Sequence, residues 1–569
     1  MRLPFSLRPA KRLFVLAFSI SVIGACSMLP LAVDREATAP VLDGFGESTL
    51  VPSQGNDAAR RLFAQGLAQA YAFNEDEAVR SFKAALAQDP RCAMCAWGVA
   101  LQLGPNINSK QRGDLSEAIN YVGHALRQSK GASARDLALI KSLALRYGHK
   151  AARAMAPPPG PVCRSAGSEE PADPLDIAYA EHMQQLAQRF PNDPDVLTLY
   201  AEAEMIATPG KWWGRGSGKS AGRIGELATM LEAGLTRHPE HVGLNHYMIH
   251  AVDAVSVAKR AEKSADLMGK LAPKSPHLLH MPSHTYAFLG RYADATRVNQ
   301  LAIAADESMM LELKKQGFSA TRDWRRHNAE FQIYAALMEG RGDLALETAR
   351  SLAGRAKGDH EAAEFMRSLP MVTLLNLQRW DALLAETKPK GDKGLATVIG
   401  EMARGIAMAR SGQASNARSA LEKLTPKAVA LLEQHKGEGA GAKIVRGLVN
   451  SAKAQLGAEI AFADQRIDDA LTLQAEAVQA ADYLEKSEPP MLANGPRQRL
   501  GWMQLRARRF AAAEQSFRDE LALHPRNGWA FNGLQAALKE QGKNTEALAA
   551  QRDMAGSWPL ADRALRNAL

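Results

Sequence analysis

Apolar and small residues recur along most of the chain at the spacing of paired amphipathic helices. In the clearest unit Gly66, Ala78, Phe82, Ala85 and Pro90 are separated by 12, 4, 3 and 5 residues. Small residues at these points let two antiparallel helices touch, the phenylalanine fills the space between them, and the proline ends the second helix. The spacing therefore predicts a helix pair in this part of the chain.

The same pattern returns several times, which predicts an array of helix pairs. Val242 and Pro276, which begin two such units, lie 34 residues apart, and so do Asn494 and Gly528. Within the unit that starts at Asn494, the familiar offsets are occupied by Gly501, Ala513, Phe517 and Pro525. Because periods of 20–50 residues are typical of stacked repeats, we expect an all-α solenoid without a β-sheet.

These offsets resemble the 34-residue tetratricopeptide repeat (TPR). The resemblance implies a right-handed α-solenoid of helix pairs, with a concave groove lined by the first helix of each pair. We expect an N-terminal solenoid with a histidine-rich groove over residues 56–435 and C-terminal repeats over 443–569. The Gly-rich run at 436–442 is predicted to be the joint between them.

The N-terminal residues predict export and a lipid anchor. Residues 1–12 are basic, residues 13–23 are apolar, and the run Ile23-Gly24-Ala25-Cys26 follows. This order is typical of a secretory signal peptide, here residues 1–25, and the last four residues resemble a bacterial lipobox. The resemblance implies acylation of Cys26; an ordinary secretory signal is the alternative. Residues 26–55 lack periodicity and predict a flexible tether.

Longer runs resemble a family of bacterial TPR lipoproteins that is largely uncharacterised. The resemblance is carried by CAMCAWGVALQLGPNIN (92–108), GLNHYMIHAVD (243–253), HLLHMPSHTYAFLGRY (277–292), RHNAEF (326–331) and SEPP (487–490). It implies a location in the bacterial cell envelope, with the protein anchored in the outer membrane and facing the periplasm. It implies no established reaction.

Half of the 14 histidines lie between His238 and His284, and this cluster is the main candidate for chemistry. Residues four apart share one helix face, so His246 with His250, and His280 with His284, form two pairs. Since the two motifs begin one repeat apart, we expect all four imidazoles to meet in the groove and to bind zinc or copper. Further candidates from the same frame are His277, His327 and Glu330.

Two functions therefore compete. In the first, the anchored solenoid is a scaffold that binds a protein or peptide partner in its groove, and the histidines form a structural polar network. In the second, the histidines hold a transition metal for storage or for hydrolysis. Pro282 lies between His280 and His284, and a helix that starts at this proline would make their shared face less certain.

Three cysteines remain after Cys26, and they suggest a disulfide. The options for Cys92 and Cys95 are a bond within the pair, a bridge from one of them to Cys163, or soft metal ligands. Cys163 lies in a Pro-rich loop that could reach either partner, so we expect it to be bonded to Cys92 or Cys95. A redox role is disfavoured because no thioredoxin-like βαβ pattern surrounds the CxxC motif.

Charge and short motifs narrow the remaining classes of function. The formal net charge of +9 includes four basic residues of the predicted signal peptide, and the rest do not cluster, which disfavours a nucleic-acid partner. The HExxH pattern is absent, and we recognise no Ser-His-Asp set, so catalysis has no positive support in the sequence.

Overall fold

The computed structural model describes residues 31–108, 113–151, 172–214, 218–319, 324–389, 394–484, 487–491, 495–563 and 565. Within these ranges the regular structure is helical, apart from one isolated bridge between Trp213 and Ser220. The predicted all-α solenoid of helix pairs is confirmed. None of the helices in the described ranges is long and apolar enough to cross a membrane.

The first part of the chain forms these helices: α1 (Asp57–Tyr71), α2 (Glu75–Gln88), α3 (Ala93–Gln102), α4 (Ser116–Gln128), α5 (Ala134–Arg146), α6 (Pro174–Arg189), α7 (Pro194–Ala207), α8 (Ile224–Arg237), α9 (Val242–Ala251), the 3-10 helix η2 (Ala258–Ala261), α10 (Glu262–Leu271), α11 (Pro276–His280), α12 (Pro282–Phe288) and α13 (Tyr292–Lys315).

The second part continues with α14 (Arg325–Met338), α15 (Gly342–Arg355), α16 (Glu361–Asn376), α17 (Trp380–Ala385), α18 (Leu395–Arg410), α19 (Ala414–Gln434), α20 (Ala440–Ala463), α21 (Ile467–Ala481), α22 (Pro496–Arg506), α23 (Phe510–Leu523), α24 (Gly528–Glu540) and α25 (Asn544–Ser557).

The predicted packing of the repeat is visible at both ends of the chain. The ring of Phe82 is fully buried between Gly66 of α1 and Gly98 of α3, where an added Cβ would lie 2.7 and 2.5 Å from the ring. Phe517 is buried in the same way between Gly501 and Gly533. A residue larger than glycine at these contacts would push the helices apart, so the small-residue spacing sets the stacking distance.

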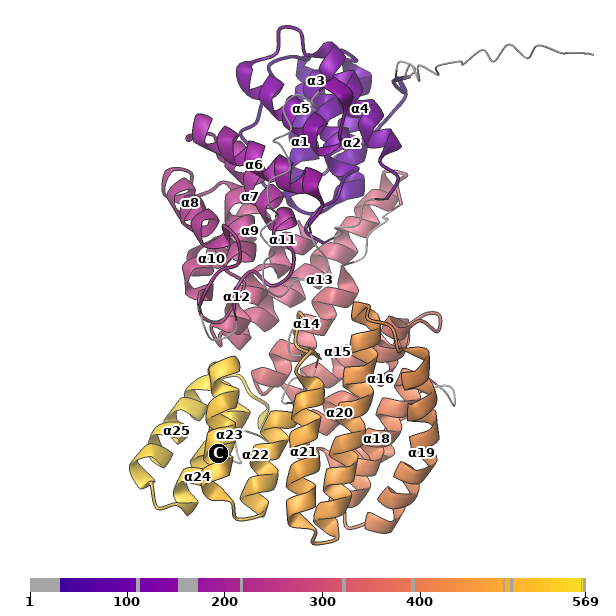
Figure 1. Ribbon diagram of the computed structural model, residues 1–569, viewed down its shortest axis with the longest axis vertical. Coiled ribbons are helices and arrows are strands. Elements are labelled where there is room, and N and C mark those ends of the chain that lie inside the picture. Colours follow the sequence, from indigo (N-terminus) through magenta and orange to yellow (C-terminus); the bar gives the residue numbers. More distant parts are fainter. Residues whose placement is uncertain are drawn as a thin grey trace, which may run out of the picture.

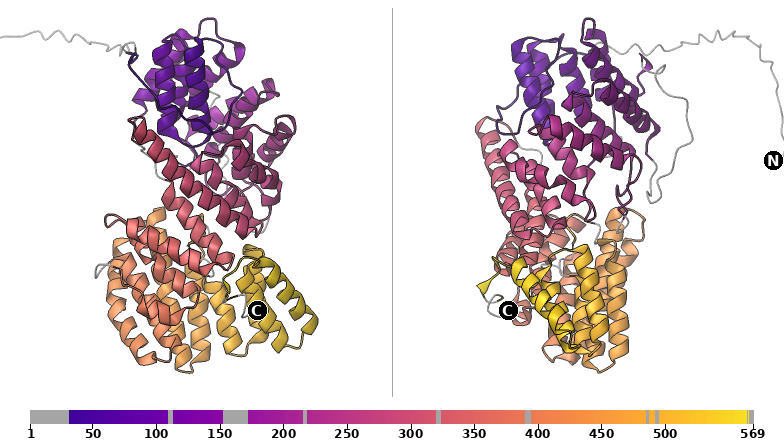
Figure 2. Two further views of the ribbon diagram at one scale, coloured as in Figure 1. Left: turned by 180° about the vertical axis from the view of Figure 1, so that it is seen from behind. Right: turned by 90° about the vertical axis from the view of Figure 1, so that its left-hand side faces the viewer.

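The helices form two bodies, with α1–α12 in one, α14–α25 in the other, and α13 running between them (Figures 1 and 2). One buried apolar cluster runs from Phe45 to Ala335, and a second runs from Tyr292 to Leu484. The two bodies therefore meet around α13 and α14. The predicted joint at 436–442 is wrong, because it lies inside the second cluster, which contains both Leu431 and Val445.

The C-terminal body closes on itself. The indole Nε1 of Trp529 donates to the carbonyl of Leu337 at 2.8 Å, and that of Trp558 donates to the carbonyl of Met338 at 3.0 Å. Both acceptors are at the end of α14, so the last repeats pack against the first helix of this body. The repeat pattern did not predict this closure, because it specifies neighbouring units and not the curvature of the whole array.

The segment predicted as a flexible tether is packed from Phe45 onward, which corrects that prediction. Phe45 and Leu50 are 4% and 1% exposed, and the backbone amide of Thr49 donates to Asp195 of α7 at 3.0 Å. The amide of Ser53 donates to Asp136 of α5 at 2.7 Å. Apolar side chains and buried carboxylates thus hold the segment in an extended course without any periodicity in its sequence.

Candidate functional site

The histidine motifs lie on four helices near the junction of the two bodies. His246 and His250 are on α9, His277 and His280 on α11, and His284 on α12. His327 is on α14. Local sequence fixes the start of α9, where the ring of His241 accepts a hydrogen bond from the amide of Leu244 at 3.2 Å. At the start of α11 the hydroxyl oxygen of Ser275 accepts a hydrogen bond from the amide of Leu278 at 3.2 Å.

One group of three imidazoles, which we call site A, consists of His246, His250 and His277. Nε2 of His246 lies 3.1 Å from Nε2 of His277 and 3.1 Å from Nε2 of His250. One ligand nitrogen from each ring lies within 4.8 Å of the others. With metal–nitrogen bonds of about 2.0 Å, a 3.1 Å separation corresponds to a bond angle of about 100°, close to tetrahedral.

Aromatic rings enclose site A. The ring centroid of Phe73 lies 4.6 Å from that of His246, 5.6 Å from that of His250 and 4.9 Å from that of His277. Trp324 covers His277 with a centroid separation of 4.6 Å. Phe73 follows α1 with φ at 51°, a left-handed conformation that costs a side-chain-bearing residue about 1 kcal/mol. This turn directs the ring onto site A.

A second group, site B, consists of His280, His284 and His327. Nε2 of His280 lies 3.1 Å from Nε2 of His284, and the ring centroids of His280 and His327 are 4.6 Å apart. One ligand nitrogen from each of the three rings lies within 4.8 Å of the others.

Pro282 does separate α11 from α12, but the two short helices stay aligned. Met281 between them keeps helical angles of φ −50° and ψ −38°, and its amide donates to the carbonyl of His277 at 2.9 Å. The proline removes only its own amide donor. His280 and His284 therefore share a face, as residues four apart do in an unbroken helix.

Site B has polar partners behind its rings. Nδ1 of His280 lies 2.7 Å from Oδ1 of Asn299, whose amide nitrogen donates to the carbonyl of Ala295 at 2.8 Å. That second bond fixes the orientation of the amide, so Nδ1 of His280 must carry the proton and Nε2 must carry a lone pair. Such a partner holds a ligand in its binding tautomer.

Two carboxylates approach the other nitrogen of His284. Oδ2 of Asp253 lies 3.5 Å from Nδ1 of His284, and Oε2 of Glu488 lies 3.8 Å from the same atom. Asp253 follows α9 in the N-terminal body, while Glu488 belongs to the segment 487–491 that precedes α22. His284 thus faces site B with one nitrogen and a carboxylate pair with the other.

Burial keeps most of these imidazoles neutral. It lowers the pKa to about 3 for His246 and His327, and it lowers the pKa well below the usual range for His250, His277 and His280. Burial also opposes the charged form of His284, but the carboxylates of Asp253 and Glu488 outweigh it and raise the pKa of His284. Neutral imidazoles are the metal-binding form.

The carboxyl groups near site B have raised pKa values. Surrounding protein, followed by the negative charge of Asp253, raises the pKa of Glu488 to about 7, although solvent moderates this effect because 53% of its side chain is exposed. Burial raises the pKa of Glu330 to about 7. A cleft of about 60 Å³ lies beside site B and is lined by residues that include Glu330, Tyr334, Glu488 and Met491.

The four histidines expected in one site are divided between two. His246 and His250 are joined by His277, and His280 and His284 are joined by His327, so two residues predicted as additional ligands are full members. Glu330 belongs to neither group; its carboxylate lies 3.9 Å from Arg326. Sequence reasoning overlooked Asp253 and Glu488, although both lie within the runs that carry the family resemblance.

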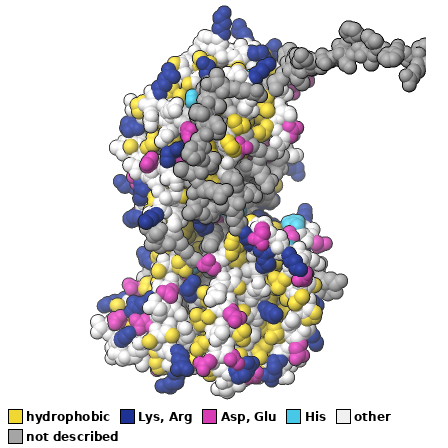
Figure 3. Space-filling view, in the orientation of Figure 1, with side chains coloured by type: hydrophobic (Ala, Val, Ile, Leu, Met, Phe, Trp, Pro, Cys, Tyr) yellow, Lys and Arg dark blue, Asp and Glu magenta, His cyan; other side chains and the backbone are white. Residues whose placement is uncertain are grey.

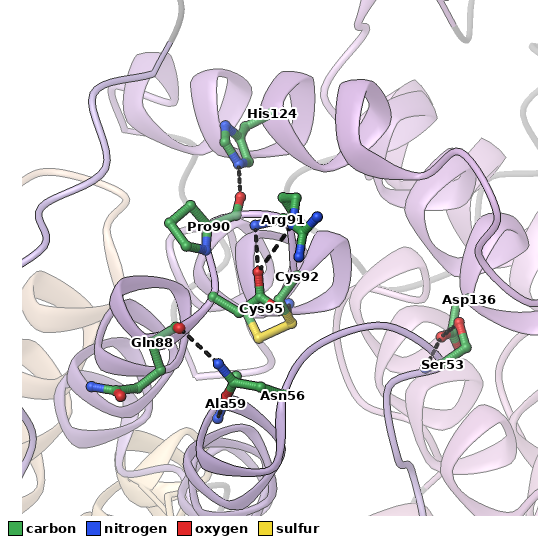
Figure 4. Close-up of a disulfide and its surroundings, with 11 residues drawn as sticks. Ser53, Asn56, Ala59, Gln88, Pro90, Arg91, Cys92, Cys95, His124 and Asp136 are labelled. Atoms are coloured by element: carbon green, nitrogen blue, oxygen red, sulfur yellow. Dashed lines mark hydrogen bonds and ion pairs between the residues drawn. A yellow bond between two sulfur atoms is a disulfide. The ribbon is translucent and has the colours of Figure 1, made fainter.

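The CxxC motif forms its own disulfide, which corrects the prediction of a bridge to Cys163 (Figure 4). Cys92 caps α3 in an extended conformation, which places its Cα 5.3 Å from that of Cys95. Closing so short a loop costs less chain entropy than reaching a distant partner. Cys163 and the predicted lipidation site Cys26 lie outside the described residues, and the disulfide is fully buried.

Comparisons with known proteins do not assign the chain to a family. No protein-family model and no curated protein matches the chain. Among solved structures, a human IFIT1 dimer with m7Gppp-AAAA covers 88% of this chain and 95% of its own, at 10% identity and a TM-score of 0.32. The Cut9–Hcn1 tetramer of APC/C covers 89% and 94%, at 11% identity and a TM-score of 0.24. At these TM-scores the likeness says nothing of what this chain binds.

Proposed function

We propose that the protein is a transition-metal-binding solenoid in which sites A and B each hold one ion. The supporting observation is the convergence of six imidazoles in two groups, each with its ligand nitrogens within 4.8 Å of one another. A single buried histidine is easily explained by packing. Two adjacent groups of three are not, because each neutral ring has only one lone pair and one N–H to share with its neighbours.

The protonation of the site B rings gives the strongest support for a bound metal. Asn299 accepts the Nδ1 proton of His280, so Nε2 of His280 presents a lone pair. If Asp253 accepts the Nδ1 proton of His284, a second lone pair faces the first at 3.1 Å. Two lone pairs at this distance repel unless a cation lies between them. Without metal that cation is a proton on His284, and a metal ion would replace it.

The donor set favours copper or zinc. All six ligands are imidazole nitrogens, which suit these ions better than magnesium or calcium. Three protein ligands leave a fourth position for water or a substrate, as in zinc sites that act on substrates. The cleft lined by Glu330 and Glu488 lies near site B, but no site B imidazole lines it.

Metal analysis of the full chain, purified without a histidine tag from metal-replete cells, tests this proposal. We expect two ions per chain, with one lost in His250→Ala and one lost in His284→Ala, while the far-UV circular dichroism is retained. His435→Ala is the control, because this ring lies at the end of α19, outside both sites, and pairs with Glu361. Metal-free wild-type protein would overturn the proposal.

A second function, the binding of an anionic peptide segment, is supported by a cleft in the C-terminal body. The cleft is lined by apolar side chains of α16, α18 and α20, together with Arg499 of α22. Arg499 donates to Oδ1 of Asn376 at 2.8 Å, but its Nη1 is buried without a hydrogen-bond partner among the described residues. Burial lowers the pKa of Arg499 to about 10. A peptide carboxylate would satisfy the group.

Capture of short peptides tests this second function. We expect the wild type to retain peptides with a free C-terminal carboxylate over the same peptides amidated, and Arg499→Met to lose that preference. Equal retention of both pools by both proteins would exclude a carboxylate partner. Nucleic acid remains disfavoured, since basic and acidic side chains are interspersed over the described part of the face in Figure 3.

Lipid anchoring in the outer membrane, facing the periplasm, completes the proposal, and its support is the run from Ile23 to Cys26. We expect Cys26→Ala to release the protein from the membrane fraction. A variant that sediments with membranes as the wild type does would refute the anchor.

A further inference from the structure

Asp253, His284 and Glu488 form a third group whose chemistry differs from that of sites A and B. The two carboxylates lie 3.5 and 3.8 Å from Nδ1 of His284, and one ligand atom from each residue lies within 4.8 Å of the others. The nitrogen involved is the one that faces away from site B, since Nε2 of His284 faces His280. The group therefore has its own ligand atoms.

Asp253 lacks a hydrogen-bond partner for one of its carboxylate oxygens among the described residues. The side chain of Asp253 is only 9% exposed, and its Oδ1 is buried without a hydrogen-bond partner among the described residues. A buried carboxylate oxygen without a donor is costly unless a cation is near. Lys211 lies close enough to act electrostatically on Glu488, but Oδ1 of Asp253 has no hydrogen-bond donor among the described residues.

The separations suit ligands around an ion. Two ligands bound at about 2.1 Å stand about 3.0–3.5 Å apart for bond angles between 90° and tetrahedral. The Asp253 distance of 3.5 Å lies at the edge of this range, and the exposed end of Glu488, at 3.8 Å, needs a shift of only a few tenths of an ångström.

We propose that Asp253, Glu488 and Nδ1 of His284 form a third cation site that takes a harder divalent ion, such as manganese(II). Two carboxylates and one imidazole favour this class of ion, whereas the imidazole-only sites A and B favour copper or zinc. Asp253 and His284 come from the N-terminal body and Glu488 from the C-terminal body, so the ion joins the two.

In part this inference rests on the proposed function, because the ring of His284 then serves two metals, one through each nitrogen. Coordination of both nitrogens requires the ring to lose its remaining proton to solvent as the second ion binds. The negative ring that results is stabilised by the two cations on either side of it.

Titration of the zinc-loaded full chain with manganese(II), followed by electron paramagnetic resonance, tests the site. Zinc occupies sites A and B first, so that manganese reports on the carboxylate group. We expect the wild type to bind one manganese ion. Asp253→Asn and Glu488→Gln should each weaken that binding about tenfold or more, because each removes one negative ligand. The zinc content of Glu488→Gln should match the wild type, whereas Asp253→Asn also removes the negative charge behind Nδ1 of His284 and should weaken site B as well. Glu540→Gln, at an exposed position, is the matched control.

The outcomes separate this inference from the proposed function. Zinc bound at two ions per chain with manganese left free, or with manganese affinity unchanged in both variants, overturns the third site alone. Manganese bound and lost in the variants, in a protein that takes up no zinc, overturns sites A and B and supports the carboxylate site.

Discussion

Sites A and B contain the same three ligand groups but differ in what surrounds them. Site A is enclosed by Phe73 and Trp324, and both of its helices belong to the N-terminal body. Site B takes a ligand from α14 of the C-terminal body, has an amide behind one ring and carboxylates behind another, and lies beside a cleft. Each site has two buried rings and one partly exposed ring, so the contrast is one of charge: carboxylates favour a proton on His284 of site B, and no ring of site A has such a partner among the described residues.

The largest expected effect of this contrast is on the pH dependence of the metal-free protein. All three site A imidazoles have lowered pKa values, so below about pH 6.5 the unfolded chain binds more protons than the folded one. Their contribution to stability is present above that pH and is lost as the pH falls, by up to about 1.4 kcal/mol per pH unit for each ring, or about 4 for the site. In site B the lowered pKa values of His280 and His327 act in the same direction as those of site A. The raised pKa of His284 opposes them, because its contribution is present below about pH 6.5 and is lost as the pH rises through its folded value.

Urea unfolding of the metal-free protein at pH 7 and pH 5.5 measures this difference. We expect a triple glutamine variant of site A to flatten the pH dependence more than the corresponding variant of site B. An equal change in both variants would show that the two environments do not differ in the way the structure indicates.

The second-largest expected effect is the loss of metal affinity when one site loses a histidine ligand. Structural zinc sites bind with about 10–16 kcal/mol, so removing one of three or four ligands costs about 3 kcal/mol, or roughly a hundredfold in affinity. His277→Ala should empty site A alone, and His327→Ala should empty site B alone, as measured by competitive chelator titration. If both variants retain full metal while His246→Ala loses it, a single four-histidine site replaces the two-site account.

A smaller effect is expected from Asn299→Ala. Its side chain holds His280 in the tautomer that presents Nε2 to site B. Loss of such a partner typically lowers metal affinity 10–100-fold. Titration should show this loss at site B with site A unchanged. Asn299→Asp, which keeps an acceptor, serves as the control and should retain most of the affinity.

The smallest expected effect is from Phe73→Leu at site A. A leucine preserves apolar burial and costs less than about 1.5 kcal/mol in stability, but it removes the ring that contacts three imidazoles. We expect site A to release metal to a chelator several times faster and site B to keep its rate, as stopped-flow absorbance would show. A faster release from both sites would mean that Phe73 does not enclose site A selectively.

Much of the fold follows from local sequence. Glycine and phenylalanine spacing predicts contacts such as Gly66 with Phe82 and Gly501 with Phe517, because these contacts lie within one repeat. The packed course of residues 45–55 depends on Asp136 and Asp195, which are distant in sequence. The closure of the C-terminal body depends on Trp529 reaching α14, and no periodicity signals that contact.

The sequence predicts that the histidines lie close together, but it does not predict which of them form each three-histidine site. Spacing places His246 with His250 and His280 with His284, because residues four apart share a helix face. Whether His277 joins the first pair depends on how α9 and α11 cross, which is a property of packing. The approach of Glu488 depends on how the C-terminal body is placed, so only a three-dimensional structure could bring it to His284.

Anomalous diffraction from crystals of the untagged, metal-replete protein tests the central claim most directly. Data on both sides of the copper and zinc absorption edges would locate each ion and identify the element. The account predicts two peaks, one among the Nε2 atoms of His246, His250 and His277 and one among the ring nitrogens of His280, His284 and His327. Ordered histidines with no anomalous peak at either position would contradict it.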